Sequence, residues 1–378
     1  MQKRFVPDEG GVFPEWEEVE FGKLFQRRSE KNGEEFGVEK TISVATMHFK
    51  PEGNKADEKS LPKYKVMRTG DIAFEGHINK HFKHGRFVLN DIGDGIISPI
   101  FEVLQPVSEL SKEVPEFWKY YINYEPVMGK ILAKCANTGI MMNRLAIKDF
   151  YKQKIKVPCI EEQRKIAAAL AAYDDMIAVK TAKLETWQEC KKRMVKEIFG
   201  RTKRFKDDDG REFPEWEENT LGEVCEKIAS GKAAEKKNDG KYPVYGATSK
   251  IGYLDKYDYD GEYVVIARVG SAGEANLRRG KFNLTDNTLL ITHGNKIAPQ
   301  FLYYALSISP IKKMAMGSVQ KLVTGKQLKG LKIQLPCMAE QQKIGSFLAE
   351  IDKAIQIQKE FIKTYADGKR RMMMELMA

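Results

Sequence analysis

Residues 158–177 read PCIEEQRKIAAALAAYDDMI, and residues 336–355 read PCMAEQQKIGSFLAEIDKAI. The two stretches align without a gap at an offset of 178 residues. In both, apolar residues follow the proline at alternating spacings of four and three, which places them on one face of a helix. Glu161, Glu162 and Glu340 fall near the expected helix starts, where acidic residues favour the positive end of the helix dipole. The sequence therefore predicts two copies of one long helix.

The same spacing continues to the end of each copy and defines ten core positions per helix, of which eight are apolar in both. The positions expected to pair the helices are Ile166, Leu170, Ile177, Leu184 and Trp187 in the first copy and Ile344, Leu348, Ile351, Ile355 and Ile362 in the second. The polar exceptions coincide, with Lys180 matching Gln358 and Lys191 matching Lys369, and polar residues at such positions commonly fix register. We interpret them as alignment residues. The alternative is that each helix packs separately on its own domain.

Two shorter repeats accompany the helices. FPEWEE occurs at residues 13–18 and 213–218, and GRFVLND at 85–91 resembles GKFNLTD at 280–286. Each half thus has closely matched ends and a divergent middle, as a duplication followed by divergence would produce. Because the first helix leads into the second half and the second helix leaves it, paired helices must run antiparallel. At about 1.5 Å per residue, 40 residues would form a rod of about 60 Å.

The predicted fold class is α+β, with two mixed α/β domains joined by a pair of long antiparallel coiled-coil helices and a pseudo-two-fold internal repeat. The predicted boundaries are 1–157 for the first domain, 158–200 for the first helix, 201–335 for the second domain and 336–378 for the second helix. The expected strands are Lys40–Thr46, Asp71–Phe74, Phe87–Leu89, Ile96–Val103, Tyr263–Arg268, Thr288–Thr292 and Lys332–Leu335. Short helices are expected at Glu116–Leu132 and Pro299–Met316.

Composition narrows the class of protein. The 378 residues are 42% hydrophobic and 31% charged, which is typical of a soluble globular protein of more than one domain. The longest apolar run, residues 166–173, is far shorter than the roughly 20 residues of a membrane span. The first residues resemble no signal peptide, and the five scattered cysteines contain no Cys-x-x-Cys pair. We expect a cytoplasmic protein with reduced thiols and no membrane partner.

Enzyme motifs are missing from the sequence. It contains no phosphate-binding Gly-x4-Gly-Lys-[Ser/Thr], no Gly-x-Gly-x-x-Gly and no Asn/Asp-Pro-Pro-Tyr of an aminomethyltransferase. No catalytic residue and no metal site is predicted. A zinc site at His77, His81 and His84 is the weaker alternative, because the cluster has no cysteine nearby and no copy in the second half.

Basic segments point to a polyanionic partner. The net charge is +10, and the stretch between Asp286 and Glu340 contains seven lysines and no acid. Arginine and lysine can clamp phosphates or bond guanine edges, so loops rich in them suit DNA. The candidate DNA-binding residues are Lys80, Lys83, Arg86, Asn143, Arg144, Arg268, Arg278, Arg279, Lys281, Gln320 and Lys321. The alternative is a solvated basic surface without a ligand.

These repeats together carry a resemblance to a known family. The chain resembles the specificity (S, or HsdS) subunit of type I restriction-modification systems. The features that carry the resemblance are Phe-Pro-Glu-Trp at 13 and 213, Gly317-Ser-Val-Gln-Lys-Leu322, Val157-Pro158, Leu335-Pro336, Glu162-Gln163, Glu340-Gln341 and the heptad helices. They extend over the whole chain.

The resemblance implies a non-catalytic, DNA-binding subunit used in phage defence. In that family, two target recognition domains each read one half of a split double-stranded DNA target, and the paired helices set the unread spacer. The helices also dock two modification subunits, which use S-adenosylmethionine to methylate adenine at N6. Two restriction subunits add translocation and cleavage driven by ATP and Mg²⁺. The resemblance therefore implies that this chain itself binds no cofactor.

Two other functions remain open on the sequence alone. A free-standing two-headed DNA-binding regulator would bind specific DNA without a methyltransferase. A single-chain nuclease or metalloenzyme would depend on the His77/His81/His84 cluster.

Overall fold

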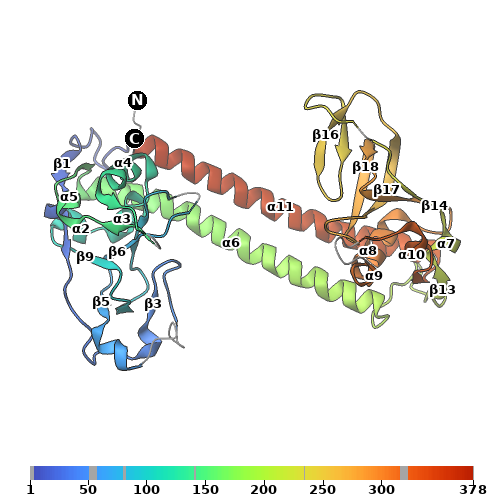
Figure 1. The fold of residues 1–378 in the computed structure, drawn as a ribbon, viewed down its shortest axis with the longest axis horizontal. Coiled ribbons are helices and arrows are strands. Elements are labelled where there is room, and N and C mark those ends of the chain that lie inside the picture. Colours follow the sequence, from blue (N-terminus) through green and yellow to red (C-terminus); the bar gives the residue numbers. More distant parts are fainter. Residues whose placement is uncertain are drawn as a thin grey trace. The chain divides into compact units, whose positions relative to one another are not determined.

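The computed structural model describes residues 4–50, 58–79, 82–139, 142–233, 235–315 and 322–377. The chain forms two compact units, which we call unit 1 (Met1–Val179 with Phe361–Ala378) and unit 2 (Lys180–Glu360). Two long helices, α6 (Ile160–Phe199) and α11 (Met338–Leu376), contribute to both units (Figure 1). Unit 1 holds the beginning of α6 beside the end of α11, and unit 2 holds the reverse, so the predicted antiparallel pair is confirmed.

Unit 1 is built around a four-stranded antiparallel sheet in the order β2-β9-β6-β7. Its strands are β1 (Glu17–Glu20), β2 (Phe25–Arg27), β3 (Ile42–Ser43), β4 (His48–Phe49), β5 (Lys65–Met67), β6 (Ile72–Glu75), β7 (Arg86–Leu89), β8 (Gly95–Ile97), β9 (Glu102–Pro106), β10 (Ala136–Asn137), β11 (Arg144–Leu145) and β12 (Lys154–Val157). Its short helices are α1 (Phe21–Leu24), η1 (Val38–Lys40), η2 (Glu58–Lys63), α2 (Glu109–Lys112), α3 (Pro115–Tyr121), α4 (Glu125–Cys135) and α5 (Ile147–Tyr151). Aromatic residues fill the core, where Phe25 packs edge-on against Trp118 and Phe150 packs against Phe21 and Phe87.

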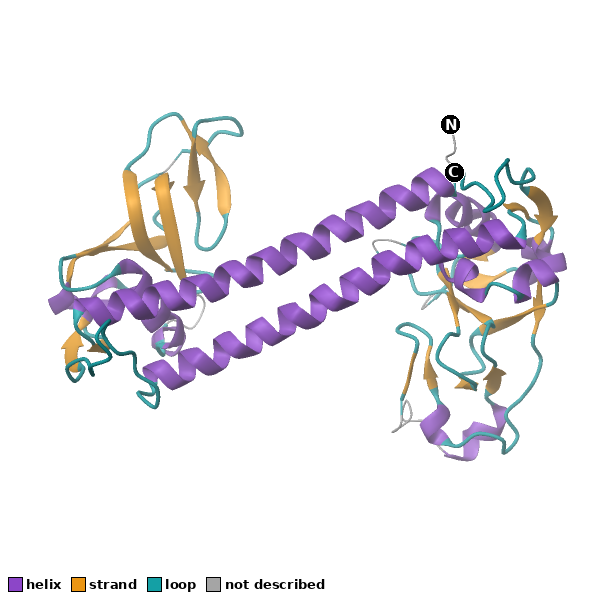
Figure 2. Ribbon diagram, turned by 180° about the vertical axis from the view of Figure 1, so that it is seen from behind, coloured by secondary structure: helices purple, strands orange, loops and turns teal. Residues whose placement is uncertain are grey.

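Unit 2 contains a larger six-stranded sheet in the order β14-β19-β17-β18-β15-β16, in which β15 and β18 run parallel and the other neighbours antiparallel. Its strands are β13 (Glu217–Thr220), β14 (Cys225–Ser230), β15 (Tyr242–Tyr245), β16 (Lys250–Leu254), β17 (Tyr259–Ala267), β18 (Ala275–Leu284), β19 (Thr288–His293) and β20 (Lys332–Leu335). Its short helices are α7 (Leu221–Val224), α8 (Pro299–Ile308), α9 (Ile311–Met314) and α10 (Gly325–Lys329). Figure 2 shows most of the strands of this sheet on one side of the short helices of unit 2.

The structure corrects several predicted elements. The expected strand Ile96–Val103 is two strands, β8 and β9, because a turn containing Pro99 separates them. The expected helix Glu116–Leu132 ends at Tyr121 and restarts at Glu125, where Pro126 occupies the first turn of α4. The helix predicted from Pro299 is likewise broken before Pro310. Strand Lys332–Leu335 is confirmed as β20.

A matched anchor explains why Phe-Pro-Glu-Trp is repeated. Trp16 Nε1 and Arg4 Nη2 both donate to one oxygen of Glu162, at 3.0 and 2.7 Å, and the Glu162 side chain is buried in the first turn of α6. Trp216 Nε1 and Arg204 Nη2 donate in the same way to Glu340 of α11, at 3.0 and 2.9 Å. A two-stranded ladder lies behind each anchor, β1 with β12 and β13 with β20. The repeated motif thus fastens each unit to the start of a long helix.

A second matched cluster joins the two helices within each unit. In unit 1, Lys369 Nζ of α11 lies 2.6 Å from Asp174 of α6, which also accepts a hydrogen bond from the Tyr120 hydroxyl at 2.8 Å. In unit 2, Lys191 of α6 contacts Asp352 of α11 at 2.6 Å, and the Tyr304 hydroxyl donates to the same carboxylate at 2.8 Å. Burial and the neighbouring carboxylate raise the pKa of both tyrosines, so they remain protonated donors. Lys191 and Lys369 therefore each bridge the two helices, and their role in fixing the register stays a prediction.

The predicted pairing positions differ in burial. The buried ones are Ile166, Leu170, Ile344, Leu348, Ile351 and Ile355. Ile177, Leu184 and Ile362 are half-buried, and Trp187 is 37% exposed. In unit 1, Ile166 and Leu170 share a core with Leu376 and Met377. The pairing role of the whole set stays a prediction. None of the helices in the described residues is long and apolar enough to cross a membrane.

Candidate nucleic-acid interface

In both units, the turn of a β-hairpin accepts a backbone hydrogen bond from a segment that lies far along the chain. In unit 1 the turn follows β6, and the backbone N–H of Asn143 donates to the Gly76 carbonyl at 2.9 Å. In unit 2 the turn follows β17, and the backbone N–H of Val323 donates to the Arg268 carbonyl at 3.1 Å. A short helix follows each contacting segment, α5 in unit 1 and α10 in unit 2. In unit 1 the fold thus brings the candidate residue Asn143 to the hairpin that carries the candidates Lys83 and Arg86.

Gly76 is required for this contact. A Cβ added at Gly76 would lie 2.0 Å from the carbonyl oxygen of Asn143, a distance that no real side chain tolerates. Close approach of two backbones is a common reason for glycine in such a position. The position of Asn143 relative to the β6–β7 hairpin is therefore fixed by backbone contact.

The cationic side chains around this site in unit 1 differ in exposure and in charge compensation. Lys83 and Arg144 are exposed. Arg86 is half-buried, donates through Nε to Glu75 at 2.6 Å and lies over the Phe82 ring at 5.3 Å. Because its charge is compensated by Glu75, Arg86 is less available to a phosphate than Lys83 or Arg144.

A cavity of about 840 Å³ opens between the hairpin, β9 and residues 138–139 and 142–145. Its lining includes Phe74, His77, Glu102, Thr138, Asn143 and Arg144. Glu102 is paired with Arg27 at 2.7 Å, so its charge is compensated. The Asn143 side chain is 4% exposed, and its Oδ1 has no hydrogen-bond partner among the described residues.

The candidate DNA-binding residues of unit 2 that the structure describes lie in two places, strand β18 and the turn after β17. Arg278, Arg279 and Lys281 lie within strand β18 and not in a loop. Arg279 Nε donates to Glu262 at 2.6 Å, and Lys281 Nζ lies 3.8 Å from Asp260. Cross-strand carboxylates therefore compensate these two cations.

Arg278 is held differently from its neighbours. Its guanidinium lies over the Tyr245 ring at 4.2 Å and donates to the Thr248 carbonyl at 2.7 Å. Burial lowers the pKa of Arg278 from its ordinary value, although arginine remains charged. Its Nε has no hydrogen-bond partner among the described residues.

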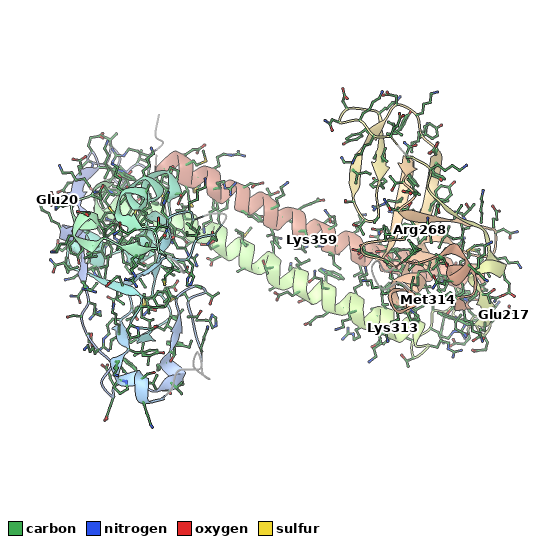
Figure 3. All side chains as sticks on the ribbon, in the orientation of Figure 1. Glu20, Glu217, Arg268, Lys313, Met314 and Lys359 are labelled. Atoms are coloured by element: carbon green, nitrogen blue, oxygen red, sulfur yellow. The ribbon has the colours of Figure 1, made fainter. Side chains whose placement is uncertain are left out.

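Arg268 is the unit 2 cation that lies at the turn itself. Figure 3 shows it at the end of β17 that faces the short helices of unit 2. Its Nη1 contacts Ser230 Oγ and the Asp286 carbonyl, both at 3.4 Å, and its Nε is buried without a partner in the described part of the chain. The same turn continues to Gly273, which packs on α9 beside Lys312. The unit 2 turn is therefore basic, as the unit 1 turn is.

Some candidate residues cannot be placed. Lys80, Gln320 and Lys321 lie outside the described residues, as does His81 of the suggested zinc cluster. Within the described ranges, no group of three or more His, Cys, Asp or Glu side chains is arranged to hold a metal ion. His77 lies 3.8 Å from Glu75 and lines the cavity.

Sequence reasoning missed the residues that position the site. Arg4 and Arg204 complete the buried anchors, yet they precede the recognised motif by nine residues in both halves. Arg4 and Arg204 lie at the same distance before Trp16 and Trp216, and this repeated spacing could have identified them. Tyr120 and Tyr304 carried a weaker signal, because the segments that contain them have diverged.

One known family matches most of the chain. The profile of the type I restriction modification DNA specificity domain matches residues 15–186 and 214–364. The chain belongs to the type I restriction-modification specificity family. Its two matched regions correspond to the two halves of the repeat.

Of two named relatives in the specificity family, one extends over nearly the whole chain and the other over about a third of it. A putative type I restriction enzyme specificity subunit, MjaX, of Methanocaldococcus jannaschii is 26% identical and covers 98% of this chain and 95% of its own length. A putative type I specificity subunit of Mycoplasma pneumoniae is 36% identical over 34% of this chain and 37% of its own. The S subunit structure from M. genitalium has a TM-score of 0.67 at 17% identity, with 99% of each chain covered. That structure shows the shared fold.

Proposed function

We propose that this chain is the DNA-binding specificity subunit of a type I restriction-modification complex and that it reads a double-stranded DNA target in two parts. The observation that carries the proposal is the repeated juxtaposition of a basic turn and a second segment, at Gly76 with Asn143 and at Arg268 with Val323. The two units share this backbone contact, whereas the side chains at the contacting positions differ. A shared backbone contact with different side chains suits two domains that recognise different base sequences.

The proposed mechanism separates positioning from reading. Exposed cations such as Lys83 and Arg144 would contact phosphates, which fixes the orientation of each unit on DNA without reading sequence. Side chains held by packing, such as Asn143 and Arg278, would contact base edges. The buried anchors at Glu162 and Glu340 would hold each reader rigidly to its helix.

The partners belong to the same proposal. We place this non-catalytic chain in the cytoplasm with two modification subunits and two restriction subunits, docked on the long helices. S-adenosylmethionine, ATP and Mg²⁺ would be bound by those partners and not by this chain. The solved structure of a type I R-M system concerned with complex assembly and conformational transition has a TM-score of 0.53 to this chain at 19% identity, and supports the fold on which the proposal rests.

The test is to coexpress the chain with its candidate modification subunit and to map N6-methyladenine across the host genome. The expected result is a split motif that appears only when both proteins are present. Copurification without any methylation would contradict the assignment of the modified base. Failure to copurify, together with tight sequence-specific binding by the chain alone, would favour the free-standing regulator.

A further inference from the structure

A buried amide without a partner marks one position in unit 1. Buried polar side chains are hydrogen-bonded in the large majority of structures. Asn143 is 4% exposed, and its Oδ1 has no partner among the described residues. Leaving such a group unpaired is unfavourable, so an unpaired group beside a cavity is a candidate for a contact with a ligand.

The surroundings of Asn143 indicate what kind of ligand fits. The side chain lines the cavity of about 840 Å³ together with His77, Thr138 and Arg144. Its backbone is held against Gly76, which fixes the point from which the side chain projects. An asparagine amide bonds adenine in a bidentate way, accepting from N6 and donating to N7. The exposed Arg144 next to it can contact the neighbouring phosphate.

Unit 2 provides an internal comparison. Val323 makes the corresponding backbone contact with the hairpin turn, although the offset of 178 residues between α5 and α10 aligns Val323 with Leu145. Val323 is fully buried and has no polar side-chain atom. The amide is therefore not required by the repeated frame, because the frame forms equally with valine.

We propose that Asn143 is a specificity-determining residue that reads an adenine in the half-site bound by unit 1. This inference rests on the proposed function, because it assumes that unit 1 binds DNA. It adds the identity of one base and of the side chain that selects it.

The experiment compares methylation motifs of the coexpressed complex carrying wild-type chain, Asn143→Val or Asn123→Val. Asn143→Val removes the amide and introduces the residue type that makes the corresponding backbone contact in unit 2. It should make one adenine position in one half of the motif degenerate, with discrimination falling about 10- to 100-fold, while the other half is unchanged. Asn123→Val is the matched control, since Asn123 Oδ1 also lacks a described partner but Asn123 does not line the cavity. This control should leave the motif unchanged.

Several results would overturn the inference. They are an unaltered motif with Asn143→Val, a loosened position that is not an adenine, and the same loosening with Asn123→Val. If the Asn143→Val chain does not assemble, 7-deazaadenine substitution decides with the wild-type complex. Removing N7 at one adenine should weaken binding about tenfold or more, and insensitivity at every adenine of both halves would refute the contact. A wild-type complex without any split motif would instead contradict the proposed function.

Discussion

Replacing Arg204 by alanine should destabilise unit 2 strongly. Arg204 Nη2 lies 2.9 Å from Glu340 Oε2, and the Glu340 side chain is 0% exposed. Removing one partner of a buried ion pair leaves an uncompensated charge and costs about 3–5 kcal/mol. Trp216 would still donate to the carboxylate at 3.0 Å, but one neutral donor does not replace a guanidinium.

The size of the effect can be measured by calorimetry of the full chain. A unit of about this length loses about 2–4 °C of unfolding temperature per kcal/mol, so Arg204→Ala should lower the unit 2 transition by about 6–20 °C. Hydrogen exchange would assign the loss to unit 2. Arg211→Ala is the control, because the Arg211–Asp209 pair is 76% and 68% exposed and such pairs contribute about 0–1 kcal/mol.

A second substitution tests the physical cause. Adding Glu340→Gln to Arg204→Ala removes the buried charge and keeps an acceptor for Trp216, so the double variant should recover at least half of the lost temperature. A loss below about 3 °C in the single variant, or no recovery in the double variant, would refute the argument that burial of Glu340 makes this anchor stabilising.

Three further predictions follow from contacts described above. Lys191→Ala removes the ion pair with Asp352 and should lower the unfolding temperature of unit 2 by a few degrees. Because salt screens ion pairs, this difference should shrink in about 1 M salt, and an unchanged difference would contradict the ion-pair role. Burial raises the pKa of Cys225 to about 12, so little of this thiol is ionised at pH 8. Peptide mass spectrometry should therefore show that iodoacetamide labels Cys225 at least about tenfold more slowly in the native chain than in denaturant, and equal rates would argue against burial. Arg144→Ala should weaken binding to all DNA sequences and reduce the slope of log affinity against log salt by about one. Arg279→Ala should change this slope less, because Glu262 compensates the charge of Arg279, and equal slopes for the two variants would count against the phosphate contact.

The sequence predicted the parts of the fold that depend on local pattern. The two long helices are evident from heptad spacing, and strand Lys332–Leu335 is evident from its apolar alternation and the proline that follows. The breaks before Glu125 and Pro310 were missed because helical periodicity continues through them. Proline could have indicated both.

Long-range contacts could not be predicted in the same way. Glu340 looked like an ordinary acid of a first helical turn, and only the fold brings it to Arg204, 136 residues away. The stretch containing Arg278 looked like a basic loop, because charge alone does not reveal the carboxylates of the adjacent strand. Asn143 stood out only as part of a basic, glycine-led segment. Its burial and its unpaired oxygen are properties of the folded chain.

The division of the chain into units has a consequence for biosynthesis. Unit 2 is continuous, but the core of unit 1 includes Leu376 and Met377, which are synthesised about 200 residues after the rest of that core. At about 5–20 residues per second, the first unit waits roughly 10 to 40 s for its last helical turns. During that interval Ile166 and Leu170 lack their partners from α11. The unit whose synthesis starts first is thus expected to finish folding last, and its nascent form is the one that a chaperone would need to protect.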